Sequence, residues 1–403
     1  MAVAPTTLLQ VAPDVTVTFG SGVDVSIAFG IDRVTAGPHG VAILEAFRAP
    51  TPMGEVLKRL GERTTGMQDW IELSAMVATF ARLGILRDPA SADRTLHAEG
   101  GRFDSARPHV LMLGDHARTE RYLAAIRQVV QPGDIVVEIG TGTGVLSVAA
   151  AQAGAARVYA IEATAIGDLA RRVFARNGVA DRVTLIEGLS SRVTLPERCD
   201  VLVAEIIGRD PLEEGVLEFT RDAVARFLKP GGRLIPSHLE LLALPVVLPD
   251  DVYAGWTFTP DAVADWQRRY GVDFSPLIEG SRRSLWKTSV SPRRLHQFEA
   301  LTPLISVVRR DLSEIGEVGF SRTVTATVGA DGTVGGVALC FAATLAPGIV
   351  LDTDPAHYRD GNSWDHLMWG LPVPVAVRTG DTLELTMRHR VDGLPLEVAV
   401  VRR

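Results

Sequence analysis

Cysteine is scarce in this sequence, with only Cys199 and Cys340 among 403 residues. The two lie far apart in the chain and lack the short spacing of metal-ligand pairs, so the sequence predicts no metal site. Buried free thiols are the favoured interpretation of both residues. Free thiols suit a reducing compartment, which predicts a cytoplasmic location.

Long apolar runs and a basic surplus are also missing. No apolar stretch reaches the roughly 18–20 residues that span a bilayer, and the N-terminus lacks the basic region and apolar core of a secretory signal. We therefore expect no membrane association. The formal net charge is −7, which disfavours a nucleic-acid partner because phosphate binding usually needs a basic surplus. An acidic balance suits a basic peptide or an amine.

The composition, 46% apolar and 22% charged, is that of a globular protein, and the length predicts two or three domains. Residues 1–90 predict a small α+β domain. Its alternating segments VTVTFG and VDVSIAF flank GSG and predict a hairpin. Three helical patterns follow, HGVAILEAF, MGEVLKRLG and WIELSAMVATFARLGIL. This order resembles a winged-helix domain, and the polar residues 91–104 predict a linker.

Two further domains are predicted after the linker. Between residues 105 and 240, strand patterns alternate with amphipathic helical patterns, which predicts a mostly parallel, Rossmann-like α/β sheet covered by helices. Between residues 241 and 403 the runs are β-rich and predict an antiparallel barrel or sandwich. An aromatic and charged segment at about 250–303 has a more helical pattern.

A glycine cluster, Gly140, Gly142 and Gly144, stands between an apolar strand pattern and a helix. Glycines let the backbone turn tightly and approach a ligand closely. Glu138 precedes the cluster, and Glu162 ends the next strand, where a carboxylate can accept both ribose hydroxyls. An acid before the cluster favours a ligand with a cationic amino group over a diphosphate. The pattern therefore predicts S-adenosylmethionine as cofactor, with a structural glycine turn as the alternative.

From about residue 109 to 381 the chain resembles the protein arginine N-methyltransferases, class I S-adenosylmethionine enzymes whose Rossmann-like domain is followed by a β-barrel. HVLMLGDHARTERY resembles that family's cofactor-covering helix. By this resemblance, His109 and Arg118 contact the methionine end of the cofactor, and Met112 faces the substrate. WQRRYGVDFS, residues 266–275, resembles the family's dimerisation arm, which implies a homodimer.

AEIIGRDPLEE resembles the family's hairpin with two glutamates, here Glu205 and Glu214. Methyl transfer is an in-line displacement, so the acceptor nitrogen must aim its lone pair at the methyl group. Two carboxylates that accept hydrogen bonds from the acceptor fix that aim and offset the developing positive charge. This chemistry predicts both as catalytic residues. The alternative is that they are ordinary acids at a strand end and a helix start.

The substrate side departs from the family's pattern. A Thr-His-Trp loop of the family aligns with NSWDHLMWG, where Trp364 is kept, Ser363 replaces the histidine and His366 follows later. Trp364 and His366 are candidate substrate contacts, with packing inside the barrel as the alternative. Glu187 and Gly188, after the third strand, complete the expected cofactor contacts. These departures favour an amine acceptor other than arginine.

The N-terminal domain resembles recognition elements of enzymes that modify ribosomally made peptides. Such domains add a leader peptide as a strand to a sheet edge, and VDVSIAFG is the candidate edge here. The combination is similar to daptide-type methyltransferases. It predicts an N-methyltransferase acting on a terminal amine of a peptide substrate whose leader docks at this domain.

Four alternatives remain open at this point. The chain could methylate arginine in proteins, methylate a small-molecule amine, or present a peptide as a non-catalytic scaffold. The N-terminal domain could also be inert packing.

Overall fold

The computed structural model describes residues 6–12, 15–19, 25–29, 32–36, 39–64, 66–87, 103, 106–281, 285–389 and 397–402. The chain divides into two compact units, one made of Met1–Pro108, Ile161–Arg172 and Leu185–Val193 and the other of the remaining residues. The predicted linker lies outside the described residues except for Phe103, and the predicted domain boundaries stay predictions. No described helix is long and apolar enough to cross a membrane.

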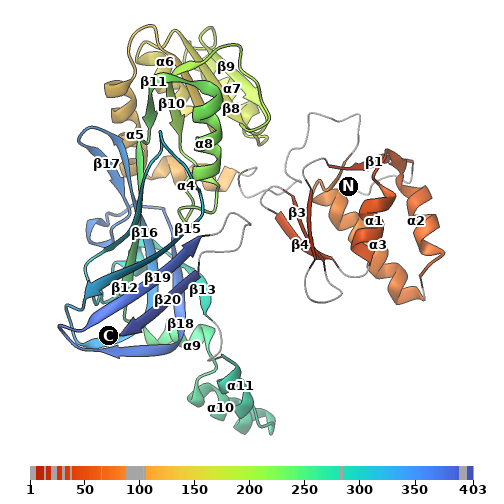
Figure 1. Cartoon of the computed structure of the whole chain (residues 1–403), viewed down its shortest axis with the longest axis vertical. Helices are drawn as coiled ribbons and strands as arrows, with labels where there is room; N and C mark the ends of the chain where they lie inside the picture. Colours follow the sequence, from red (N-terminus) through yellow and green to blue (C-terminus); the bar gives the residue numbers. More distant parts are fainter. Residues whose placement is uncertain are drawn as a thin grey trace. The chain divides into compact units, whose positions relative to one another are not determined.

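The N-terminal part is a small α+β region, in line with the sequence (Figure 1). In α2, Val56 and Leu60 are buried four residues apart while Lys58 and Arg59 face outward, so one stripe of the helix packs inward. The helices here are α1 (His39–Ala46), α2 (Met53–Gly61) and α3 (Met67–Arg82). The strands are β1 (Leu8–Val11), β2 (Thr16–Phe19), β3 (Val25–Phe29), β4 (Asp32–Ala36), β5 (Thr51–Pro52) and β6 (Leu86–Arg87).

The predicted hairpin is present, but the expected sheet edge is not where the sequence placed it. β2 and β3 pair antiparallel, with Val17 opposite Ile27. β3 also pairs with β4, so the order is β2–β3–β4 and β3 is the middle strand. The prediction that VDVSIAFG forms a free edge is therefore wrong, because a strand that the sequence analysis did not identify covers its second side. Among the described strands, β2 and β4 are the edges of this sheet.

A five-stranded sheet in the order β11–β10–β7–β8–β9 confirms the predicted Rossmann-like domain (Figure 1). β10 runs parallel to both of its neighbours, β7 and β11. All five residues of β7 are buried, as expected for a strand covered on both faces. The strands are β7 (Ile135–Ile139), β8 (Arg157–Glu162), β9 (Val183–Glu187), β10 (Cys199–Ala204) and β11 (Leu228–Ile235). The helices α6 (Val145–Gln152), α7 (Gly167–Arg176) and α8 (Val216–Phe227) lie between them in the sequence.

The strand order places a topological switch point between β7 and β10. β7 is followed along the chain by β8 on one side, whereas β10 lies on its other side. Open parallel sheets bind ligands at the carboxyl ends of the strands at such a point. The glycine cluster directly follows β7 and Glu205 directly follows β10, so the fold brings these two sequence motifs to one edge.

The C-terminal part is antiparallel, as predicted, and consists of two sheets. One has the order β13–β18–β16–β12–β14 with β17 paired to β16, and the other has the order β15–β19–β20. Its strands are β12 (His238–Val246), β13 (Trp286–Val290), β14 (Ile305–Asp311), β15 (Phe320–Thr327), β16 (Gly332–Ala346), β17 (Ile349–Asp352), β18 (His366–Val377), β19 (Thr382–His389) and β20 (Glu397–Arg402).

Two groups of helices flank these β elements. The predicted cofactor-covering helix is two helices, α4 (Ala106–Gly114) and α5 (His116–Val129), divided at Asp115. The predicted arm region holds α9 (Asp250–Trp256), α10 (Pro260–Tyr270), α11 (Ser275–Ser281) and α12 (Pro292–Leu295). α10 and α11 extend away from the two antiparallel sheets (Figure 1).

Candidate functional site

Arg118 lies in the first turn of α5 and is the centre of the candidate site. Its guanidinium forms an ion pair with Glu205, and both side chains are about nine-tenths buried. Nη1 of Arg118 also donates to the carbonyl oxygen of Met112 at 3.2 Å. Burial is the largest influence on Arg118 and lowers its pKa, whereas the charges of Glu138 and Glu214 are among those that raise it. Arg118 is therefore a buried cation that pairs with Glu205 and on which the charges of Glu138 and Glu214 also act.

The glycine cluster forms a tight turn after β7. All three glycines have positive φ values, at +74°, +54° and +87°, a region that L side chains rarely adopt. A Cβ on Gly144 would lie 2.5 Å from the ring of Phe174, so this position also has no room for a side chain. A Cβ on Gly142 would lie 3.5 Å from the imidazole of His109, which is buried. The loop thus leaves its backbone open to close approach, with His109 beside it.

Glu138 is held in a buried hydrogen-bond cluster. Its exposed fraction is 2%, and its Oε2 accepts hydrogen bonds from the hydroxyls of Thr141, at 2.7 Å, and of Ser147. A buried carboxylate needs such donors to stay charged. These contacts orient the acid that the sequence assigned to the cofactor's amino group.

Glu162 and Glu187 have different surroundings. Glu162 is buried, and its Oε1 accepts from the backbone nitrogen of Thr164 at 2.9 Å and from its hydroxyl at 2.7 Å. Glu187 is half-exposed and pairs with Arg171 at 2.7 Å. The backbone nitrogen of Gly188 donates to the carbonyl of Glu162 at 2.8 Å. Glu162 is thus a fixed buried acid at a strand end, whereas Glu187 makes a surface ion pair.

Trp364 and His366 lie in different environments although they are two residues apart. Trp364 donates from Nε1 to the carbonyl of Gly208 at 3.2 Å, and its ring lies 5.6 Å from the guanidinium carbon of Arg118. His366 is 3% exposed and its Nδ1 lies 3.1 Å from the carbonyl oxygen of Leu339. Burial lowers the pKa of His366, which favours a neutral ring. Trp364 therefore lies beside Arg118 and Glu205. His366 is instead packed inside the β domain, which was the alternative that the sequence analysis gave for it.

Asp115 is a site residue that the sequence analysis missed. It caps α5 by accepting from the backbone nitrogen of Arg118 at 3.1 Å. Its other oxygen accepts from the backbone nitrogen of Ser363 at 2.8 Å. The signal for the cap was present, since an aspartate before a helical pattern is a common N-cap. The contact with Ser363, 248 residues further along the chain, carried no local signal.

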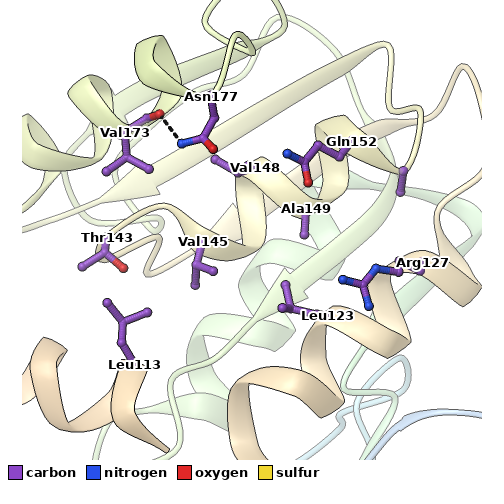
Figure 2. A pocket seen from close by; sticks show the side chains of 11 residues that line it. Leu113, Leu123, Arg127, Thr143, Val145, Val148, Ala149, Gln152, Val173 and Asn177 are labelled. Atoms are coloured by element: carbon purple, nitrogen blue, oxygen red, sulfur yellow. Dashed lines mark hydrogen bonds between the residues drawn. The ribbon is translucent and has the colours of Figure 1, made fainter. Parts of the chain in front are cut away.

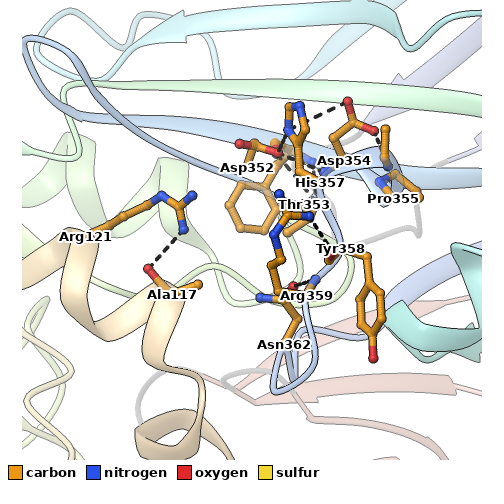
Figure 3. Close-up of polar contacts among 12 residues, drawn as sticks. Ala117, Arg121, Asp352, Thr353, Asp354, Pro355, His357, Tyr358, Arg359 and Asn362 are labelled. Atoms are coloured by element: carbon orange, nitrogen blue, oxygen red, sulfur yellow. Dashed lines mark hydrogen bonds and ion pairs between the residues drawn. The ribbon is translucent and has the colours of Figure 1, made fainter.

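The segment before Ser363 is held by short polar contacts (Figure 3). His357 Nδ1 lies 2.8 Å from Oδ1 of Asp352. Asn362 accepts from the backbone nitrogen of Arg359 at 2.8 Å. These contacts shape the connection between β17 and β18, which carries Ser363 and Trp364 to Asp115 and Arg118.

A hollow of about 510 Å³ is lined by residues of α4, α5, α6 and α7 (Figure 2). Its wall is largely apolar, with Leu113, Leu123, Val145 and Val148 facing it and Arg127 at its border. None of the predicted site residues lines it. It is therefore distinct from the Arg118 cluster.

Comparison with known proteins shows that this chain is similar to methyltransferases. Residues 113–240 match the model of the ribosomal protein L11 methyltransferase (PrmA) family. The chain is 39% identical over 173 residues to a probable protein arginine N-methyltransferase 6 of Arabidopsis thaliana, covering 42% of this chain and 38% of that protein. It is 31% identical over 209 residues to protein arginine N-methyltransferase 6 of Danio rerio, covering 51% and 58%. The chain thus spans less than two thirds of these relatives.

Solved structures show the same fold over a longer stretch. A Trypanosoma brucei PRMT1 enzyme–prozyme heterotetrameric complex with AdoHcy contains a chain with a TM-score of 0.62 and 20% identity, covering 75% of this chain and 99% of that one. Arabidopsis thaliana protein arginine methyltransferase 10 gives a TM-score of 0.57 at 24% identity, covering 74% and 98%. The parallel sheet followed by an antiparallel β domain is therefore the architecture of these enzymes. The chain is a homologue of S-adenosylmethionine-dependent N-methyltransferases.

Proposed function

We propose that this protein is an S-adenosylmethionine-dependent protein arginine N-methyltransferase. The observation that carries the proposal is the buried ion pair of Arg118 with Glu205, which directly follows β10 at the switch point of the sheet, with the charge of Glu214 also acting on Arg118. Separate sequence motifs had predicted these residues, and the ion pair of Arg118 with Glu205 and the effect of the Glu214 charge on Arg118 support a shared role. The similarity to arginine methyltransferases supports arginine as the first acceptor to test.

The residues present fit the proposed cofactor. The positive-φ glycines give an open backbone cradle, Glu138 and Glu162 are buried carboxylates, and Arg118 is a buried cation. Glu138 would hold the amino group of the cofactor, Arg118 its carboxylate and Glu162 its ribose. When bound, S-adenosylmethionine supplies a methyl group on a sulfonium centre.

Glu205 and Glu214 would act on the acceptor. As carboxylates they accept hydrogen bonds from its N–H groups and hold one nitrogen in line with the methyl group. For a guanidinium, whose pKa lies above about 12, they also draw the positive charge away from the attacking nitrogen. The buried position of Glu205 strengthens this effect, because electrostatic interactions are stronger where water is excluded.

A terminal amine of a peptide is the second candidate acceptor. The observation that favours it is Ser363, which stands where the resemblance expects a histidine and which contacts Asp115 through its backbone. An α-amine, with an unperturbed pKa near ~8, is partly neutral and needs less assistance than a guanidinium. The N-terminal α+β region, with β2 and β4 at the edges of its sheet, supports peptide docking by strand addition.

We also infer that two copies of the chain form a homodimer through the arm. The arm carries aromatic rings in edge-to-face contact: Trp266 and Tyr270 on α10, Phe258 just before α10, and Phe274 just before α11. Tyr270 is 65% exposed, which is unusual for a ring of this size in a packed cluster. The apolar hollow beside Leu113 offers a surface on a second copy for these rings.

Tandem mass spectrometry of methylated peptides tests the proposed function. Purified protein and S-adenosylmethionine would be given matched peptides with an internal arginine, a free terminal amine or both. We expect methylation of the arginine side chain and a loss of at least about 100-fold with Glu214→Gln. The matched control is Glu213→Gln, which changes the neighbouring, more exposed acid. Methylation confined to the terminal amine would support the second candidate, and no transfer by the wild-type protein would reject both.

A further inference from the structure

Tyr122 carries a buried hydroxyl that the site described above does not use. The side chain is 1% exposed. Its hydroxyl has no hydrogen-bond partner among the described residues. Buried polar groups in folded proteins nearly always have a partner, and one that lacks it calls for a ligand or a bound water. The orphan hydroxyl is therefore a feature that the protein alone does not explain.

Tyr122 lies on the same helix as Arg118, one turn further along. Tyr122 follows Arg118 by four residues on α5, so both side chains lie on one face of the helix. The charge of Arg118 acts on the Tyr122 hydroxyl, and the two groups therefore lie within electrostatic range of each other. Burial raises the pKa of Tyr122 well above its usual value, so the hydroxyl keeps its proton at neutral pH and is a donor.

The chemistry of the missing partner follows from these neighbours. The guanidinium of Arg118 has donors only, and in the described part of the chain it contacts Glu205, the carbonyl and sulfur atoms of Met112, and the ring of Trp364. A group that satisfies both a buried hydroxyl and the guanidinium beside it must be an acceptor, and an anionic one gains most. A carboxylate has two oxygens and can accept from both donors at once.

We propose that Tyr122 is a further cofactor-binding residue whose hydroxyl donates to the carboxylate of the methionine end. This inference rests on the proposed function, since it assigns a second donor to the group that Arg118 would hold. In this arrangement α5 holds the carboxylate with two donors, Arg118 and Tyr122, which are one helical turn apart; we call this pair the clamp. The clamp orients the methionine end, and therefore the sulfonium methyl, relative to Glu205 and Glu214.

Calorimetric binding of S-adenosylhomocysteine to wild-type protein and to Tyr122→Phe tests the inference. The substitution removes one oxygen and keeps the ring. We expect affinity to fall about tenfold, the effect of losing a hydrogen bond to a charged group. Binding of 5′-methylthioadenosine, which lacks the amino-acid end, should be equal in the two proteins. The matched control is Tyr159→Phe, whose hydroxyl donates to Glu197 at 2.9 Å, and it should bind S-adenosylhomocysteine normally.

Thermal unfolding without ligand gives an independent readout. Because the Tyr122 hydroxyl has no partner among the described residues, Tyr122→Phe should unfold at the same temperature as the wild type or at a higher one. A lower unfolding temperature would show a structural partner and overturn the proposal. Unchanged affinity for S-adenosylhomocysteine, or an equal loss for both ligands, would also overturn it. Failure of the wild-type protein to bind S-adenosylhomocysteine would instead reject the proposed function.

Discussion

At the scale of single residues, the arrangement around Arg118 sets the chemistry. The guanidinium of Arg118 forms an ion pair with Glu205. Burial lowers its pKa, whereas the charges of Asp115, Glu138 and Glu214 raise it. Burying an ion pair costs desolvation energy that offsets much of the Coulomb attraction between the two groups. A ligand group of the same charge in a better position can therefore replace one of the two partners. The pair between Arg118 and Glu205 therefore competes with both proposed ligands, since Arg118 would bind the cofactor and Glu205 the acceptor.

This competition predicts an unusual phenotype for Glu205→Gln. Neutralising Glu205 removes the protein's own partner of Arg118, so we expect S-adenosylhomocysteine to bind at least as tightly as in the wild type. Methyl transfer should fall by at least about 100-fold, because one acceptor-orienting carboxylate is lost. Isothermal titration and a transfer assay measure the two effects separately. Binding that is tenfold weaker would contradict the competition.

At the scale of secondary-structure elements, Asp115 joins a helix to a distant loop. It caps α5 and accepts from Ser363, so the turn that bears Arg118 and the connection that bears Trp364 share one buried carboxylate. A capping side chain alone stabilises by about 1 kcal/mol. Hydrogen bonds to a charged group add about 1.5–3 kcal/mol each when a partner is left unsatisfied.

Comparing two capping residues tests this double role. Asp115→Ala should lower the free energy of unfolding by about 2.5–4 kcal/mol, because it removes a cap and at least one hydrogen bond with the loop. Thr259→Ala removes only the cap of α10, where the hydroxyl accepts from Ala262 at 3.2 Å, and should cost about 1 kcal/mol. Urea denaturation measures both. Equal losses would show that the contact with Ser363 contributes nothing.

The connection between β17 and β18 predicts a pH dependence. The hydrogen bond from His357 to Asp352 is the largest cause that raises the pKa of His357 above its usual value. Its stabilising contribution is complete below the unfolded pKa of about 6.5 and is lost as pH rises through the raised folded pKa. Because His357 is largely exposed, we expect no more than about 0.5 kcal/mol. The stability advantage of wild type over His357→Gln should shrink as pH rises above about 6.5, and a constant difference would contradict this origin.

At the scale of the whole molecule, exposed apolar surface is what the proposed homodimer would cover. Leu113 in the hollow is 40% exposed and Tyr270 on the arm is 65% exposed. In a two-fold symmetric dimer, the arm of each copy would pack against the hollow of the other, so the same contact would form twice.

Charge substitutions test this assembly. Leu113→Asp and Tyr270→Asp should each convert the dimer to a monomer, because an unpaired carboxylate would be buried in the interface. Val373→Asp changes an equally accessible residue of β18, 58% exposed, and should leave the dimer intact. Sedimentation velocity separates the two masses. A wild-type protein that sediments as a monomer would reject the arm–hollow pairing.

The sequence by itself determined the elements and their chemical types. Apolar runs predicted β7 and β10, the GxGxG cluster predicted the turn between β7 and α6, and β-rich runs predicted the antiparallel β domain. These signals are local, because strand burial and positive φ depend on a residue and its near neighbours. The two glutamates and Arg118 were likewise identified from short motifs.

Only the tertiary structure decided which side chains meet. The pairing of Arg118 with Glu205 spans 87 residues and that of Asp115 with Ser363 spans 248, distances over which a single sequence holds no periodic signal. The same limit explains why β3 was expected at an edge, since only pairing with β4 shows that its second side is covered. It also explains His366, whose position after Trp364 suggested a site contact, whereas the packing of β18 against β16 buries the ring in the β domain.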